Sequence, residues 1–239
     1  MVQQAVNPPA FSPMGFPFSK LFDHTLLKAY ASRADLERLC GECRQYGFAM
    51  AAINPAQVSL CRELLEGSGV HVGAAVSFPL GQTTIRQKAF ETASAIEDGA
   101  DEIDYVVNIS RLKDRDYAYL EREMEEIVRL CRQAGRISKV IFENCYLTKE
   151  EIVQLCHIAS RVGPDFIKTS TGFGTGGATF EDVALMRQNA DPRIRIKAAG
   201  GVRELDTALK MVELGATRIG TSAGVSIMEA FRARFPDGQ

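Results

Sequence analysis

Four predicted strands of this sequence carry charged residues where a buried strand would have none. The four residues are Asp104, Glu143, Lys168 and Lys197. A charge within a strand that is buried on both faces is costly unless it is paired or functional. We therefore take these four side chains as the first candidates for chemistry.

Two of them, Lys168 and Lys197, fall in successive predicted strands. Neighbouring strands lie about 4.8 Å apart, so two ammonium groups there would repel each other. Repulsion and burial both disfavour the charged form, which predicts one neutral, nucleophilic amine near neutral pH. A neutral lysine attacks a carbonyl carbon to form a Schiff base. Asp104 is then the candidate acid–base partner, kept ionised by the second lysine.

The alternation of side chains along a strand supports this interpretation. Ile194 and Ile196 suit the outer face of their strand, which turns Lys197 inward, and the same pattern turns Asp104 inward. The alternative is a buried ion pair, of a lysine with Asp104 or Glu143, that fixes the register of the sheet without catalysing anything. Two lysines on successive strands favour catalysis over that alternative.

Glycine-rich segments lie at the ends of the last three predicted strands: two follow the sixth and seventh, and one spans the end of the eighth and the start of the helix after it. They are Gly172–Gly177, the pair Gly200-Gly201, and Gly220–Gly224. Glycines let the backbone approach an anion, and amides at a helix N-terminus donate hydrogen bonds to it. A lone pair of glycines is typical of a tight turn, but three clusters on successive loops beside two lysines favour a phosphate site.

A polar triplet, Asp23-His24-Thr25, ends the first predicted strand. His24 has the chemistry of a catalytic base or a metal ligand, but His71 and His157 offer no ligand spacing with it. We expect a structural or substrate-contacting cluster here. Another candidate motif, Cys40-Gly41-Glu42-Cys43, has the spacing of a redox or zinc pair. It falls on the apolar stripe of a predicted helix, which favours core cysteines.

The elements that must position these residues alternate regularly after residue 20. Eight short apolar segments are predicted as strands: Leu21–His24, Phe48–Ile53, His71–Phe78, Glu102–Val107, Lys139–Asn144, Phe166–Thr171, Ile194–Ala199 and Arg218–Thr221. The intervening segments have helical spacing, with Ser32 and Thr148 as predicted N-caps. Eight strand–helix units of about 30 residues predict a (β/α)8 TIM barrel. The alternative, a doubly wound sheet, lacks its Gly-x-Gly-x-x-Gly turn after the first strand.

Composition and charge narrow the class of protein. The chain has 239 residues, 46% of them hydrophobic, and a net charge of −2. We expect one barrel domain over residues 21–239, preceded by a proline-containing arm over residues 1–20 that is extended or partly disordered. The charge balance argues against nucleic acid as a partner, and no apolar segment is long enough to span a membrane. Without a visible signal peptide, we expect a cytoplasmic protein with reduced cysteines.

The sequence resembles the class I aldolase family of the deoxyribose-phosphate aldolases, which are (β/α)8 barrels. The likeness extends from Asp23 to about Ile227, and its most specific parts are Gly99–Asp104, Asp165–Phe173 and Lys197–Arg203. It implies reversible cleavage of 2-deoxy-D-ribose 5-phosphate to D-glyceraldehyde 3-phosphate and acetaldehyde, in deoxyribonucleotide catabolism. It also implies no metal, no cofactor, and a homodimer or homotetramer.

The resemblance assigns roles to individual residues. Lys168 would be the Schiff-base lysine, while Asp104 and Lys197 would relay protons, with Lys197 also lowering the pKa of Lys168. The phosphate would be bound by Gly172, Gly200, Gly201, Gly220 and Ser222. Asp23 and Thr25 would contact the sugar hydroxyls at the rim.

This chain departs from the family pattern at three places. Ala52 replaces a common cysteine, Asn144 follows Glu143 where threonine is common, and no tyrosine stands at the C-terminus. Two alternatives also stay open: a Schiff-base barrel enzyme for a different phosphorylated sugar, and a non-catalytic barrel that binds a phosphosugar.

Overall fold

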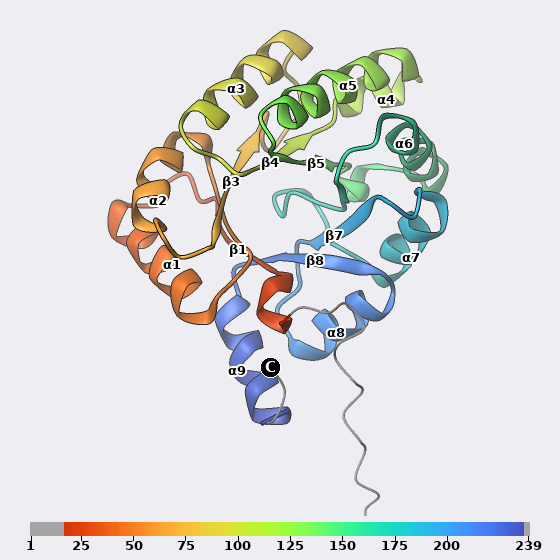
Figure 1. Ribbon diagram of the computed structural model, residues 1–239. Helices are drawn as coiled ribbons and strands as arrows, with labels where there is room; N and C mark the ends of the chain where they lie inside the picture. The colour runs from red at the N-terminus through yellow and green to blue at the C-terminus, as the bar shows by residue number, and fades with distance from the viewer. Residues whose placement is uncertain (1–16, 237–239) are drawn as a thin grey trace, which may run out of the picture.

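A closed barrel of eight parallel strands forms the centre of the molecule, in the order β1 to β8 (Figure 1). The computed structural model describes residues 17–236. The strands are β1 (Phe22–Leu26), β2 (Met50–Ile53), β3 (His71–Val76), β4 (Glu102–Val106), β5 (Ile137–Ile141), β6 (Phe166–Lys168), β7 (Arg195–Ala199) and β8 (Ala216–Thr221). The predicted (β/α)8 barrel is confirmed, and the doubly wound alternative is wrong.

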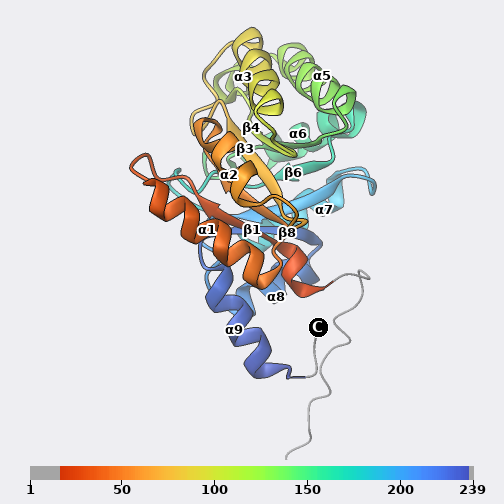
Figure 2. The same ribbon diagram turned by 60° about the vertical axis from the view of Figure 1, so that its left-hand side comes forward.

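Helices surround the barrel on its outside (Figure 2). They are α1 (Arg33–Tyr46), α2 (Val58–Leu64), α3 (Ile85–Glu97), α4 (Ile109–Lys113), α5 (Tyr117–Gln133), α6 (Lys149–Val162), α7 (Phe180–Asn189), α8 (Leu205–Glu213) and α9 (Gly224–Arg234). Ser32 and Thr148 each close a capping box at the start of α1 and α6, as their spacing from Asp35 and Glu151 predicts. These caps set where the helices begin.

The hydrophobic core lies between the strands and the helices. Ile103, Tyr105 and Ile196 belong to it and are fully buried on the outer faces of their strands. Cys40 and Cys43 are buried, unbonded thiols of α1, so the predicted core role is confirmed for this pair. With apolar side chains turned outward, the alternate positions of β4 to β8 point into the barrel, where charged residues gather.

Strands β5 and β6 end earlier than the sequence predicts. Both predictions ran on through the polar residues that follow, to Asn144 and Thr171, whereas the strands end at Ile141 and Lys168. Glu143 has a left-handed backbone (φ +59°), which turns the chain out of the strand. Its carboxylate accepts hydrogen bonds from the amide and hydroxyl of Thr171, so side-chain contacts also tie the two segments together after the strands end.

Regular structure is present a few residues before the predicted boundary at residue 21. Phe18–Leu21 form a 3-10 helix, and the buried Phe18 ring stacks on Phe231 with their centroids 4.1 Å apart. The rest of the predicted N-terminal arm, residues 1–16, lies outside the described residues. Within residues 17–236, no helix is long and apolar enough to cross a membrane.

Candidate active site

Lys168 and Lys197 are direct neighbours across the β6–β7 pair, as their places in successive strands predict. Both ammonium groups contact one carboxylate oxygen, Asp104 Oδ2, at 2.8 Å from Lys168 Nζ and 2.6 Å from Lys197 Nζ. All three side chains are buried. The predicted constellation therefore forms inside the barrel, toward the C-terminal ends of its strands, where barrel active sites lie.

The pKa of Lys168 is lowered from its ordinary value to about 8. Burial is the largest cause, because the charged amine loses its hydration. The carboxylate of Asp104 opposes this effect, while the ammonium groups of Lys197 and Lys139 add to it. Lys168 is thus poised to lose its proton near neutral pH, as a nucleophilic amine must.

Asp104 remains ionised in spite of its burial. Burial alone would raise the pKa of its carboxyl group, but the ammonium groups of Lys139, Lys168 and Lys197 hold that pKa well below its usual range. Because its Oδ2 contacts both Lys168 and Lys197, this ionised carboxylate can accept a proton from either of these two amines.

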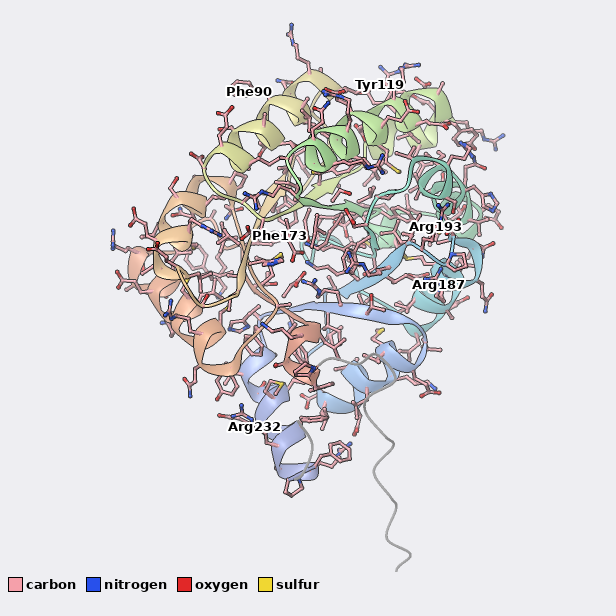
Figure 3. The ribbon with its side chains drawn as sticks, in the orientation of Figure 1. Phe90, Tyr119, Phe173, Arg187, Arg193 and Arg232 are labelled. Atoms are coloured by element: carbon pink, nitrogen blue, oxygen red, sulfur yellow. The ribbon has the colours of Figure 1, made fainter. Side chains whose placement is uncertain are left out.

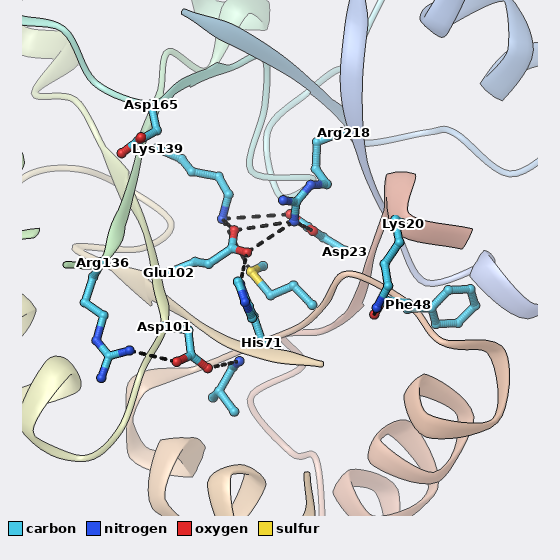
Figure 4. A network of polar contacts seen from close by, with 12 residues as sticks. Lys20, Asp23, Phe48, His71, Asp101, Glu102, Arg136, Lys139, Asp165 and Arg218 are labelled. Atoms are coloured by element: carbon cyan, nitrogen blue, oxygen red, sulfur yellow. Dashed lines mark hydrogen bonds and ion pairs between the residues drawn. The ribbon is translucent and has the colours of Figure 1, made fainter. Parts of the chain in front are cut away.

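Four residues of the site were missed in the sequence: Glu102, Lys139, Arg218 and His71. Lys139 Nζ lies 2.6 Å from Asp104 Oδ1. It also lies 2.5 Å from Glu102 Oε2 (Figure 4). Arg218 reaches Glu102 at 3.3 Å, and His71 Nδ1 is 2.7 Å from Glu102 Oε1. Glu102, Lys139 and Arg218 each stand first in a predicted strand, where a charge is easily taken for a solvated end.

The charges in this network point to Lys168 as the amine that gives up its proton. Four cations, Lys139, Lys168, Lys197 and Arg218, face three carboxylates, Asp23, Glu102 and Asp104. With all seven groups ionised, one positive charge is in surplus. Lys168 contacts only Asp104, whereas Lys197 contacts both Asp104 and Asp23. Loss of a proton from Lys168 therefore makes the net charge of the cluster zero and removes only one ion pair.

Asp23 does not lie at the rim, where it was predicted to contact sugar hydroxyls. Its carboxylate is fully buried, 2.5 Å from Lys197 Nζ and 2.6 Å from the Arg218 guanidinium. Asp23 is on the inner face of β1, so its side chain joins the charged network inside the barrel. In this position its carboxylate binds Lys197 and Arg218.

The other residues of the polar triplet lie at the mouth of the barrel. Thr25 lines the cavity there and donates a hydrogen bond to the carbonyl of Asp23 at 2.8 Å. His24 Nε2 is 2.7 Å from Glu42 Oε2, at the cavity wall. His24 thus belongs to a polar cluster, as predicted, and its described ion-pair partner is a carboxylate of α1.

A cavity of about 460 Å³ opens above Lys168. It is lined by all five predicted phosphate-site residues, namely Gly172, Gly200, Gly201, Gly220 and Ser222. Gly201 has φ +79°, and a Cβ there would point into open space, so its backbone faces the cavity without obstruction. Arg203 also lines the cavity and adds a cation that was not singled out in the sequence.

Two further residues shape the mouth of this cavity. Phe173 lies near the centre of the barrel opening (Figure 3), and its ring meets Phe78 edge-on with the centroids 5.3 Å apart. Of the two carboxylates in the buried ion-pair alternative, Asp104 pairs with both lysines and Glu143 pairs with neither. It binds Thr171 instead and so fixes the loop that carries Gly172 and Phe173.

Comparison with known proteins adds a family to this geometry. The model of the family described as DeoC/LacD family aldolase matches residues 19–230.

The chain belongs to the DeoC/LacD aldolase family.

Relatives of this aldolase are similar to it along nearly the whole chain. The deoxyribose-phosphate aldolase of Bacteroides thetaiotaomicron is 56% identical over 212 residues, which cover 89% of each chain. That of Lactobacillus acidophilus is 53% identical over 220 residues, covering 92% of this chain and 93% of the relative. The tetrameric structure of deoxyribose phosphate aldolase from Aeropyrum pernix has a TM-score of 0.84 at 33% identity, covering 90% and 91% of the two chains.

The departures from the family pattern have definite places in this aldolase. Ala52 lies in β2 on the same face as Met50, whose Sδ is 3.3 Å from Lys139 Nζ, so position 52 faces the barrel interior. The side chain of Asn144 is buried, with its Nδ2 3.4 Å from Met186 Sδ, and therefore points toward α7 and away from the cavity. The C-terminal residues 237–239 lie outside the described residues.

The lowered pKa of Lys168 predicts the pH dependence of its reaction with aldehydes. About half of the amine is neutral at a pH equal to the pKa, and roughly one tenth is neutral one unit below it. We expect initial rates of reductive trapping with acetaldehyde to rise with pH and to reach half of their maximum near pH 8. Peptide mass mapping at a series of pH values between about 6 and 10 measures this. A midpoint near the pKa of an exposed lysine would contradict the buried environment of Lys168.

Proposed function

We propose that this aldolase reversibly cleaves 2-deoxy-D-ribose 5-phosphate to D-glyceraldehyde 3-phosphate and acetaldehyde through a Schiff base on Lys168. The single observation that carries the proposal is the contact of Lys168 and Lys197 with one oxygen of Asp104 beneath a cavity lined by glycine loops. The deoxyribose-phosphate aldolases with more than half of their aligned residues identical support the same substrate.

The reaction begins with the neutral amine of Lys168. Its nitrogen attacks the C1 aldehyde carbon of the open-chain sugar, and the resulting carbinolamine loses water to give a protonated imine. Removal of the proton from the C3 hydroxyl then breaks the C2–C3 bond, and the bonding electrons move toward the imine nitrogen. D-Glyceraldehyde 3-phosphate leaves, and acetaldehyde remains on Lys168 as an enamine. The imine serves as the electron sink, so the step needs no metal.

Asp104 and Lys197 transfer the protons in this reaction. The enamine takes a proton at C2, and the imine that results is hydrolysed to release acetaldehyde. Asp104 Oδ2 is 2.6 Å from Lys197 Nζ and 2.8 Å from Lys168 Nζ, so a proton passes between the two amines through one oxygen. We assign Asp104 the transfer to and from substrate through a bound water, and Lys197 the role of keeping that carboxylate ionised.

The phosphate group is bound by the glycine loops at the other side of the cavity. The backbones of Gly172, Gly200 and Gly201 approach the cavity, and Gly220 and Ser222 lie just before α9, whose N-terminus favours an anion. Arg203 supplies a full positive charge in the same cavity. Thr25 stands near the sugar hydroxyls, while the buried Asp23 acts on them only through Lys197.

Borohydride trapping with acetaldehyde, followed by peptide mass mapping, tests the mechanism. We expect the adduct on Lys168, and its absence would overturn the proposal. A panel of phosphorylated aldehyde acceptors, with acetaldehyde as donor, tests the substrate. Preference for D-glyceraldehyde 3-phosphate supports deoxyribose 5-phosphate, and preference for another acceptor assigns the enzyme to a different sugar. A non-catalytic phosphosugar-binding barrel would give neither an adduct nor a product.

We also propose an oligomeric state and a cellular location for the enzyme. The tetrameric Aeropyrum pernix relative supports a homo-oligomer, either a dimer or a tetramer. A role in deoxyribonucleotide catabolism and six free cysteines fit the cytoplasm. Light scattering at several protein concentrations measures the size of the assembly, and a monomer throughout would contradict it.

Ala52 predicts tolerance of unsaturated aldehydes. A cysteine at position 52 would face the barrel interior near the lysines, where its thiol captures crotonaldehyde condensed on Lys168. We expect Ala52→Cys to lose activity in crotonaldehyde at least about tenfold faster than the wild type, because a positioned nucleophile reacts as if highly concentrated. The control is Ala49→Cys, since Ala49 is also buried but lies at the opposite end of the barrel. Equal losses in all three proteins would sink this explanation.

A further inference from the structure

The barrel has a second cavity at the end opposite to Lys168, where the strands begin. Its volume is about 400 Å³, and its lining includes Lys20, His71, Phe166, Arg195, Thr217 and Arg218. Within residues 17–236, no side chain lines both this basal cavity and the catalytic one. Phe166 starts β6 and Lys168 ends it, so the two cavities are separated by the charged layer inside the barrel.

Positive charge dominates the basal cavity. Lys20, Arg195 and Arg218 are cations, and the hydrogen bond to Glu102 raises the pKa of His71. The carboxylates nearest to this end are Asp23 and Glu102, both fully buried behind Arg218, together with Asp101 and Asp165. Asp101 is already bound by the guanidinium groups of Arg62 and Arg136. Among residues 17–236, no carboxylate lines the cavity, whereas Lys20, Arg195 and Arg218 do.

Three hydrogen-bond donors at this cavity have few or no hydrogen-bond acceptors among residues 17–236. The Arg195 guanidinium lies 4.0 Å from the centre of the Phe166 ring, and its nearest carboxylate, that of Asp165, is 3.8 Å away, beyond hydrogen-bond distance. Lys20 Nζ donates to one backbone carbonyl, that of Phe48, at 3.2 Å (Figure 4). The buried hydroxyl oxygen of Thr217 has no hydrogen-bond partner among residues 17–236.

We propose that the basal cavity binds a small oxyanion, of the phosphate or carboxylate class. The guanidinium of Arg195 offers a planar fork of donors that matches two oxygens, and Lys20 adds a point charge across the opening. A volume of about 400 Å³ suits a small metabolite. The floor is closed by the Arg218 ion pairs with Asp23 and Glu102, which excludes a long chain from passing through.

Equilibrium dialysis with labelled inorganic phosphate, and separately with labelled malonate, tests this site. The test variant is Lys20→Gln/Arg195→Gln, because neither residue belongs to the catalytic network. The matched control is Arg193→Gln/Lys210→Gln, which also removes two positive charges. Arg193 lies on the α7 side of the molecule (Figure 3), and both control side chains are exposed.

We expect the wild type and the control to bind two phosphates per chain, one at the glycine loops and one in the basal cavity. The test variant is expected to bind the basal phosphate at least about tenfold more weakly, since it lacks two donors of charge-assisted hydrogen bonds. The same loss with malonate assigns the site to oxyanions in general, and a loss with phosphate alone assigns it to phosphates. Unchanged phosphate binding in the test variant overturns the proposal.

Trapping of acetaldehyde on Lys168 keeps this result separate from the proposed reaction. The test variant is expected to form the adduct at the wild-type rate, which shows that its barrel is folded. If adduct formation is normal and the basal phosphate is retained, only the basal site is refuted. If the wild type forms no adduct, the Schiff-base mechanism fails whatever the dialysis shows.

Discussion

Lys168→Met is expected to lower kcat/KM for cleavage of 2-deoxyribose 5-phosphate by at least about 10⁴-fold, because removal of a covalent nucleophile leaves only binding and general electrostatics. The same variant is expected to give no acetaldehyde adduct at the active site. Methionine fills nearly the same volume as lysine, so the packing inside β6 is retained. A coupled assay of D-glyceraldehyde 3-phosphate formation measures the loss.

The melting temperature of Lys168→Met separates a lost nucleophile from a lost fold. The cluster of four cations and three carboxylates becomes three and three when Lys168 is removed. We therefore expect the variant to melt at the same temperature as the wild type or above it, since catalytic groups are often kept at a cost in stability. Lys210→Met, at an exposed position of α8, is the matched control and should leave both quantities unchanged. Substantial turnover by Lys168→Met would rule out the Schiff base.

The barrel was predictable because the sequence patterns that specify it are local and recur in each strand–helix unit. Apolar strands buried on both faces, capping residues such as Ser32 and Thr148, and glycines that end helices are all readable within one strand–helix unit. Strand ends were less predictable where polar residues continue an apolar segment. The turn at Glu143 depends on a contact with Thr171, 28 residues away, which no local pattern contains.

The three proposed catalytic residues were predictable for a different reason from the charged network that surrounds them. Asp104, Lys168 and Lys197 interrupt apolar segments, so each one stands out against its neighbours. Lys139 and Glu102 begin their apolar segments, and there a charged residue looks like an ordinary strand end. Their role depends on strand register, since Asp104 pairs with Lys139 across β4 and β5, and register emerges only when the barrel closes.

The predicted position of Asp23 was wrong because the end of its strand was misplaced. It belongs to a polar triplet at the predicted end of β1, and the triplet as a whole suggests the rim. The strand continues to Leu26, so Asp23 is near its start, and alternation turns the side chain inward to Lys197 and Arg218. A shift of a few residues in a strand end is thus enough to move a carboxylate from the substrate to the supporting network.

Asp104→Asn is expected to lower kcat by about 10²- to 10⁴-fold, the usual contribution of a positioned acid–base group. The amide cannot accept a proton from Lys168 or Lys197, and it no longer offsets the charges of three neighbouring lysines. Breaking a buried ion pair in this way also destabilises the fold by about 3–5 kcal/mol. Asp206→Asn removes an exposed ion pair with Arg234 and is the matched control, and we expect it to leave the melting temperature nearly unchanged, because exposed ion pairs contribute little to stability.

The decisive readout for Asp104→Asn is the pH midpoint of trapping on Lys168. In the wild type, the Asp104 carboxylate raises the pKa of Lys168 against the effects of burial and of the other two lysines. Without that carboxylate the ammonium form loses its stabilising partner, so the pKa of Lys168 falls and the midpoint moves below about pH 8. The maximum rate falls at the same time, because proton transfer is impaired. A residue that only supported the fold would leave the midpoint in place, and an unchanged midpoint with normal turnover would remove Asp104 from the mechanism.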